Sequence, residues 1–242
     1  YVHYNTVHPY SIIVFMKDPL SLLHNNPNLW RARDQHGACA RFALGVDKLD
    51  EVLQGGIHTS GMIRVSCATG SGELSLFKQV ISQPREHKLR VFINPPAELQ
   101  APWLVTQGIA IEQVLIITPT NEADALWAAE QCLKSAACHC VLLWSNAISP
   151  KEARRLQVAA SHNDALCFLF SHLNKNMTSL PVVLDIKLAV KESNIVVDIL
   201  KHRQGWPINN LVIPFTWTPS NHAIQWAMLN NKRNPRPLHS VS

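Results

Sequence analysis

The sequence predicts an α/β fold, a mainly parallel sheet flanked by helices with an antiparallel edge formed by its C-terminal strands. Short apolar, β-branched runs alternate with stretches of helical period between residues 62 and 170, which is the pattern of parallel strands joined by crossover helices. After Pro181, segments 182–190 and 195–199 alternate with period two, which is typical of antiparallel strands. The 242 residues are 47% apolar, enough to form one sizeable core.

The elements follow in chain order. Residues 42–53 predict a turn into a short helix, which Gly55-Gly56 ends. A strand over 62–66 leads into a glycine loop and then a helix with Leu74 and Phe77 on one face. A helix containing Trp103 ends near Gly108. Further strands are predicted over 89–93, 114–117, 140–144 and 166–170.

Capping residues mark two helix starts. Asn121 is a favourable N-cap. The buried stripe of the helix that it starts is predicted to comprise Leu126, Ala129, Leu133 and Ala137. In the segment 149–152, serine can cap a helix, proline suits its first turn, and glutamate can bond back to the cap amide.

The chain is predicted to have three parts. Residues 1–40 read as a poorly ordered segment with a short helix, 41–217 as the main domain, and 218–242 as a basic tail. The net charge of +5 and the pI of about 9.0 are compatible with nucleic acid or an acidic protein partner and select neither. No apolar run approaches the ~18 residues of a membrane helix, and no export signal accompanies the scattered cysteines. We therefore expect a cytoplasmic protein without a membrane partner.

The segment CATGSGELSLFKQ, residues 67–79, nearly matches a phosphate-binding loop. Gly70 and Gly72 keep the backbone that could cradle a phosphate. However, Glu73 stands where a working loop has lysine, and Leu74 replaces the hydroxyl residue that holds magnesium. A unit-charge contact near 4 Å is worth ~4 kcal/mol near a protein surface, so reversing its sign opposes triphosphate binding.

Two further positions for nucleotide hydrolysis are also unfilled. The strand 140–144 runs into Ser145-Asn146, without the acid that would hold magnesium, and Asn94 leads to Pro95-Pro96, without a glutamate to orient water. The alternative is a hydrolase with rearranged groups. We interpret the loop as part of a catalytically empty scaffold, with no catalytic residue and no cofactor.

Whole segments of the chain resemble known families. The segments 44–50, 55–56, 61–63 and 70–72 look like the ATPase core of RecA-type recombinases. The segments 124–130, 153–157 and 165–170 are similar to the SulA/ImuA family of bacterial SOS-response proteins, and 29–31 and 199–203 look like its longer ImuA branch. The resemblance covers residues 28 to 215 and implies a RecA-like, P-loop NTPase-type fold without a functional nucleotide site.

The resemblance implies partners as well. ImuA proteins are accessory factors of error-prone translesion DNA synthesis, which implies a Y-family polymerase homologue, an error-prone replicative-type polymerase and RecA. SulA proteins are shorter and block polymerisation of FtsZ. The tryptophan that division inhibitors use falls on Trp103, so Trp103 and Gln107 are candidate partner contacts, but a lysine implicated in them falls on Gln113. The sequence therefore favours translesion synthesis, with FtsZ inhibition as the alternative and an active RecA-like ATPase as the second.

Other groups of residues have competing interpretations. Candidate DNA contacts are Arg154, Arg155, Lys201 and Arg203, although a solvated surface explains them equally well. Lys232 and Arg233 in the tail are candidate partner contacts.

Aromatic and cysteine residues are assigned mainly to the core. Trp127 and Trp144 are expected there, whereas Trp103, after Pro102, is equally suited to be an exposed anchor. Cys138-His139-Cys140, with Cys132 nearby, would suggest a metal site or a Cys–His nucleophile. On a strand, however, Cys138 and Cys140 point one way and His139 the other, so we expect buried cysteines and no metal.

Overall fold

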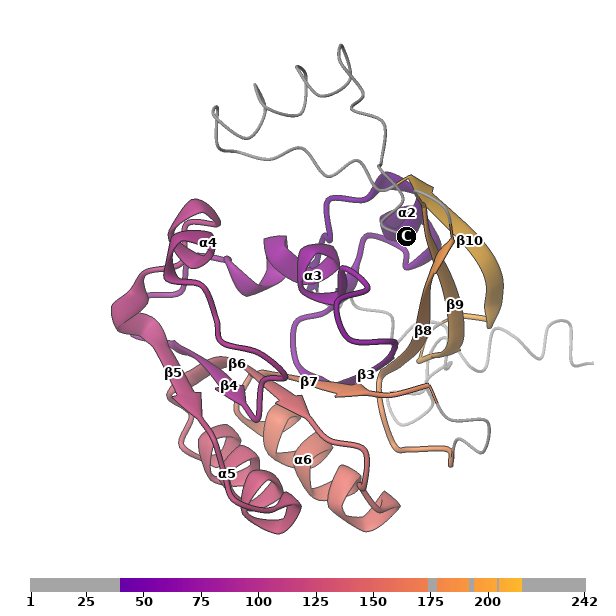
Figure 1. Ribbon diagram of the computed structural model, residues 1–242. Coiled ribbons are helices and arrows are strands. Elements are labelled where there is room, and N and C mark those ends of the chain that lie inside the picture. Colours follow the sequence, from indigo (N-terminus) through magenta and orange to yellow (C-terminus); the bar gives the residue numbers. More distant parts are fainter. Residues whose placement is uncertain (1–39, 174–177, 192–193, 204, 215–242) are drawn as a thin grey trace, which may run out of the picture. The chain divides into compact units, whose positions relative to one another are not determined.

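The computed structural model of the chain describes residues 40–173, 178–191, 194–203 and 205–214. All of these except Ala40 belong to one unit, which begins at Arg41. In this described part, an eight-stranded mixed sheet carries helices on both faces (Figure 1). A small two-stranded sheet, β1 (Arg41–Phe42) and β2 (Ile57–His58), stands beside it.

The strands of the large sheet in chain order are β3 (Gly61–Ser66), β4 (Leu89–Ile93), β5 (Val114–Ile117), β6 (Cys138–Trp144), β7 (Leu166–Ser171), β8 (Leu184–Lys191), β9 (Asn194–His202) and β10 (Ile208–Pro214). The helices are α2 (Asp47–Val52), α3 (Glu73–Ile81), α4 (Ala101–Thr106), the 3-10 turn η2 (Ile111–Gln113), α5 (Glu122–Lys134) and α6 (Pro150–His162).

The strand order is β10-β9-β8-β3-β7-β6-β4-β5, and the pairs from β8 to β5 are all parallel. The predicted α/β class with a mainly parallel sheet and an antiparallel edge is confirmed. One detail is wrong, because β8 pairs in parallel with β3 and only its other side is antiparallel, to β9. The sequence analysis missed β10, which pairs antiparallel with β9 and forms the edge.

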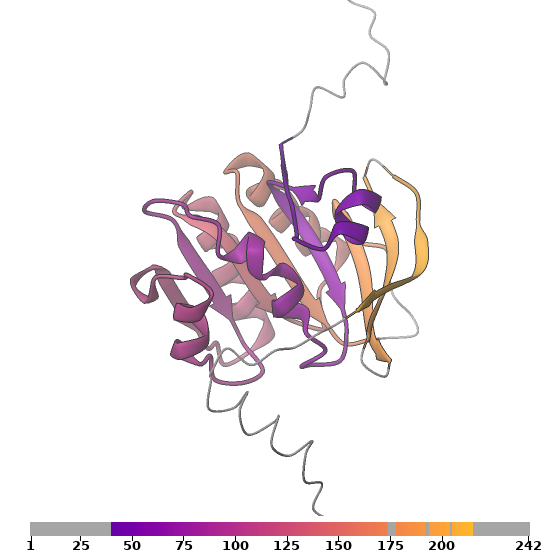
Figure 2. The same cartoon turned by 90° about the horizontal axis from the view of Figure 1, so that it is seen from above.

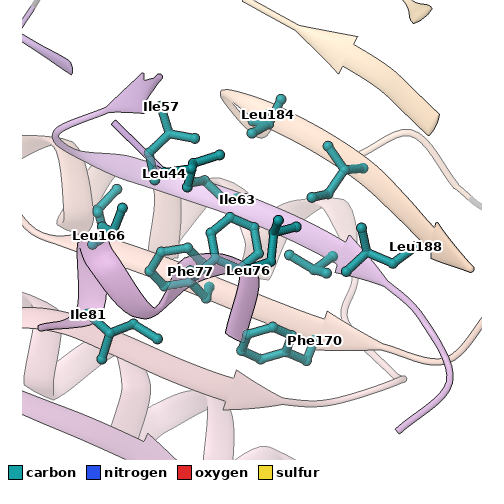
Figure 3. Packing of buried hydrophobic residues seen from close by; sticks show 14 of the residues in the cluster. Leu44, Ile57, Ile63, Leu76, Phe77, Ile81, Leu166, Phe170, Leu184 and Leu188 are labelled. Carbon is teal, nitrogen blue, oxygen red and sulfur yellow. The ribbon is translucent and has the colours of Figure 1, made fainter. Parts of the chain in front are cut away.

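Two apolar layers sandwich the sheet. On one face, α2, α3 and α4 pack over strand residues such as Ile63, Leu142 and Phe168. Figure 3 shows part of this cluster, with Phe77 of α3 among side chains from several strands. On the other face, α5 and α6 bury many alanines against Val141 and Leu169. Figure 1 shows the two helical layers on opposite sides of the sheet, and Figure 2, seen from above, shows α3 in front of the sheet and α5 and α6 behind it.

The predicted caps are present. The Asn121 side chain accepts a hydrogen bond from the Asp124 amide, and Ser149 and Glu152 form a complete capping box. The buried stripe of α5 is confirmed for Leu126, Ala129 and Leu133. Ala137 is a correction, because α5 ends at Lys134 and Ala137 is exposed.

Trp127 is a second correction, since its side chain is 63% exposed instead of buried. It follows Leu126 by one residue, about 100° around the helix, and this rotation carries it away from the sheet. Trp144 is half-buried and packs against the core as expected, stacked 4.8 Å from Phe170.

The predicted direction of the cysteines in β6 is wrong. Cys138 packs with the α5–α6 layer, whereas Cys140 packs with the α3 layer. The register against β4 shifts between these residues, so that His139 is an extra residue in the strand, which reverses the alternation. His139 is itself buried, and its Nε2–H donates to the Val80 carbonyl at 2.8 Å.

The described residues include no helix whose length and apolar composition would suit a membrane span. They also bring together no group of three or more His, Cys, Asp or Glu side chains that would suit a metal ion.

Candidate functional site

The altered phosphate loop joins β3 to α3, as the sequence predicts. Gly70 has φ +80° and Gly72 has φ +84°, and this left-handed region favours glycine. A Cβ at Gly70 would meet no atom within 4 Å, so its backbone conformation alone accounts for glycine there. The turn is held by Ser71, whose hydroxyl donates to the Ala68 carbonyl at 2.6 Å.

Glu73 fills the loop from inside. Its Oε1 accepts a hydrogen bond of 3.2 Å from the Gly70 amide, and its side chain is buried, with the residue only 5% exposed. The other oxygen, Oε2, is buried and accepts no hydrogen bond from a described residue. The backbone donor that a phosphate oxygen would need is therefore bonded to a carboxylate of the chain itself.

The surroundings of Glu73 are poor in charge. A cleft of about 60 Å³ opens beside it, bordered by Trp144, Asn146 and His172 among others. This volume holds a few water molecules and is well below that of a typical small-molecule site. Burial, with a contribution from Glu73, raises the pKa of Cys67 to about 12, so this thiol is not a nucleophile at neutral pH.

The strand ends next to the loop carry amides in place of acids. Asn94 follows β4, and its side-chain NH₂ donates to the Trp144 carbonyl at 3.3 Å. Asn146 follows β6, and its Oδ1 accepts a hydrogen bond from the His172 amide at 2.7 Å. Both side chains therefore brace backbone segments. Neither supplies the negative charge that holds magnesium or activates water.

A second feature is a set of exposed aliphatic side chains on α4, η2 and β5, which we call the aliphatic edge. It comprises Val105 of α4, Ile111 of η2, and Leu115 and Ile116 of β5, which are 40% to 57% exposed. β5 is the last strand of the sheet, so one side of its backbone is unpaired within the described residues. Exposed apolar surface beside an open strand edge is typical of protein-binding surfaces.

The predicted partner contacts Trp103 and Gln107 lie on α4 and at its C-cap, and α4 also carries Val105 of the aliphatic edge. Trp103 is half-buried and packs against the core, and the Gln107 amide donates to its carbonyl at 3.1 Å. The aliphatic edge itself was missed by the sequence analysis. Its only signal was the unbroken apolar run of β5, which reads equally well as a buried strand.

Gln113 faces inward, toward a buried cation. Its Oε1 accepts a hydrogen bond from the guanidinium of Arg90, a residue only 2% exposed. Arg90 also donates to the carbonyls of Ile81, Gln83 and Lys88, and burial lowers its pKa. A lysine at position 113 would place a second cation against Arg90. Gln113 is thus a structural residue that links η2 to the core.

The candidate DNA contacts have separate local roles. Arg155 pairs with Glu130 of α5, whereas Arg154 of α6 makes no ion pair with a described residue. Lys201 of β9 donates to the Leu180 carbonyl at 3.0 Å, and Arg203 is exposed. No interaction joins the two pairs in the part of the chain that the structure describes. Lys232 and Arg233 lie outside the described residues.

The fold and the loop together define an α/β protein in which Glu73 of the chain itself occupies the glycine turn between β3 and α3. No family model matches the chain. A stretch of 84 residues is 27% identical to cell division inhibitor SulA of Photorhabdus laumondii subsp. laumondii. That alignment covers 35% of this chain and 48% of the relative, so the chain spans about half the length of the relative it matches.

Among solved structures, the chain is 23% identical to SulA from Pseudomonas aeruginosa, with a TM-score of 0.39. The comparison covers 46% of this chain and 98% of that one. Such a score is too low to establish a shared fold. Part of the chain is therefore similar in sequence to SulA, and the expected ImuA specificity and RecA-like phosphate-loop fold are not confirmed.

Proposed function

We propose that the chain is a non-enzymatic cell division inhibitor that acts in the cytoplasm as part of the SOS response, by direct contact with FtsZ. The observation that carries this proposal is the sequence similarity to a protein described as a cell division inhibitor. This similarity reverses the order of the two functions. The sequence favoured translesion synthesis, whereas the comparisons support the alternative, FtsZ inhibition, and offer nothing for the polymerase partners.

The altered loop supports the non-enzymatic part of the proposal. Glu73 uses the Gly70 amide, and amides replace the acids at Asn94 and Asn146. We expect no measurable binding of Mg-ATP by isothermal titration calorimetry and no turnover. Tight nucleotide binding that is lost in Gly72→Val would contradict this and favour the ATPase alternative.

The aliphatic edge is the contact surface that we propose for FtsZ. It lies beside Trp103 and Gln107, and its four aliphatic side chains are the kind that become buried at interfaces. Gln113 is excluded from the contact because it is bonded to Arg90. The inhibitor surface would thus consist of α4 and the exposed side of β5.

The central experiment measures GTP-dependent polymerisation of purified FtsZ by light scattering, with the full chain added. We expect inhibition by the unchanged chain and its loss in Val105→Asp, because the carboxylate would have to be desolvated at the contact. Val190→Asp on β8 is the matched control, since Val105 is 57% exposed and Val190 is 56% exposed, and β8 lies far from β5 in the strand order. Equal loss in both variants, or no inhibition by the unchanged chain, would contradict the proposal.

Overexpression in cells provides a second measurement. Filamentous growth that Val105→Asp or Trp103→Ala relieves would support division inhibition. Normal division, together with recovery of a Y-family polymerase homologue in pull-downs from DNA-damaged cells, would restore the translesion function.

A further inference from the structure

The outer side of the helical layer opposite α3 and α4 carries a groove that no proposed function uses. It runs between α5 and α6 and has a volume of about 360 Å³; most of its lining residues are polar or charged, but the surface that faces the groove, which we call the apolar floor, is formed mainly by carbon atoms. Val158 lies on its border and is 51% exposed. Trp127 is 63% exposed and precedes Lys134, another border residue, by two turns on the same side of α5.

The charges around this α5–α6 groove are mostly positive. Its border includes Lys134, Arg154 and Arg155 against one acid, Glu130. Glu130 is already used, because Arg155 pairs with it and Lys134 Nζ lies 2.7 Å from its Oε1. The Arg155 hydrogen bond, more than any other interaction, lowers the pKa of Glu130, which therefore stays ionised. Arg154 has no such partner among the described residues and is exposed.

We infer that the α5–α6 groove is a docking site for an acidic, amphipathic segment of a partner protein. The apolar floor beside Val158, with the exposed Trp127 two turns further along α5, would take spaced apolar side chains, as grooves between helices do with amphipathic peptides. Arg154 and its neighbouring cations would meet the carboxylates of that segment. This surface is independent of the aliphatic edge, which lies with α4 and β5.

Charge complementarity favours a partner protein over two other candidate occupants, the C-terminal residues 215–242 and DNA. Residues 215–242 contain no Asp or Glu, so this part of the chain cannot supply the carboxylates. DNA fits poorly, since its backbone needs a continuous positive surface, whereas here an ionised Glu130 and an apolar floor interrupt the cations. An acidic peptide satisfies the cations and the apolar floor together.

The test uses the full chain and a phage-displayed library of random linear peptides. Selection is run against the unchanged chain and counter-selected against Arg154→Glu/Val158→Asp. Both positions are exposed, so this variant is expected to fold, which circular dichroism verifies. We expect the enriched peptides to combine Asp or Glu with apolar residues at helical spacing. Neutral or basic sequences, or the absence of any peptide that distinguishes the two chains, would overturn the inference.

Fluorescence anisotropy with the most enriched peptide then tests single residues. Arg154→Glu should weaken binding about tenfold or more, because one attraction becomes a repulsion. Lys48→Glu is the matched control, with the same charge change on α2 at the opposite face of the sheet, and should leave binding unchanged. Competition by a short DNA duplex that depends on Arg154, with no effect of Val158→Asp, would replace the peptide with DNA and overturn the inference.

Discussion

Two arginines are buried in the same sheet, and they are stabilised by different means. Arg64 of β3 meets Asp185 of β8, its direct neighbour across the parallel pair, through both Nε (2.9 Å) and Nη2. Arg90 of β4 pairs with no carboxylate of a described residue and donates to three carbonyls and the Gln113 amide oxygen. The first arrangement joins two strands of the sheet, whereas the second joins β4 to the segment after α3 and to η2.

The two arginines are therefore expected to support different properties: Arg64 the stability of the sheet, and Arg90 also the proposed contact surface. The Arg64–Asp185 pair lies where β8 joins the sheet, far along the strand order from β5. Arg90 holds η2, from which the aliphatic edge continues into β5. Loss of the ion pair should therefore lower the stability of the chain as a whole. Loss of the Gln113–Arg90 hydrogen bond should lower stability and, in addition, displace the surface that we propose for FtsZ.

The largest effect is expected from Asp185→Ala. Removing the carboxylate leaves the Arg64 charge buried without a counterion, which costs about 3–5 kcal/mol of unfolding free energy. Urea denaturation followed by circular dichroism measures this loss. The double change Arg64→Met/Asp185→Leu should recover most of it, since both charges are then gone. If the double variant is no more stable than Asp185→Ala, the buried charge is not the cause.

A smaller effect is expected from Gln113→Leu, which leaves one Arg90 donor without its acceptor and costs about 1–3 kcal/mol. Gln113→Glu should retain stability, because it offers Arg90 the kind of partner that Arg64 has. FtsZ inhibition should fall in the leucine variant and persist in the glutamate variant. Full inhibition by Gln113→Leu would show that the Arg90 network does not position the aliphatic edge.

The smallest effect concerns a buried base that is kept neutral. Burial, followed by Arg41, Arg203 and His202, lowers the pKa of His58 from 6.5 to about 4. Between these values the unfolded chain binds more protons than the folded chain, so His58 favours folding above pH 6.5 and this contribution is lost as the pH falls toward 4. Urea midpoints at pH 7 and pH 5 should differ less in His58→Asn than in the unchanged chain.

Much of the fold followed from local patterns in the sequence. The strands around the loop and both capped helices depend on neighbouring residues, and these were predicted. The direction of β8 was not predictable, because a strand's own residues do not state the direction of its partners. β10 was missed because Asn209-Asn210 interrupts its apolar pattern at the register shift. The bulge at His139 likewise depends on pairing with β4.

The candidate site was predictable only in its residue types. The sequence shows that Glu73 replaces a lysine, but the bond from Gly70 to its carboxylate depends on how the loop closes. The inward direction of Gln113 required the position of Arg90, which is distant in sequence. Trp127 was assigned to the core because it sits beside the predicted buried stripe, whereas mainly small alanines fill the contact between α5 and the sheet.

The hydrogen bond between Gly70 and Glu73 has a consequence for regulation. A protein that binds a nucleotide at a glycine turn can change shape when the nucleotide is exchanged, so that its activity follows the nucleotide supply. A chain whose own glutamate occupies this turn has no such nucleotide-dependent switch. Under the proposed function, the strength of the division arrest would follow the number of copies present, and recovery would require their destruction or dilution.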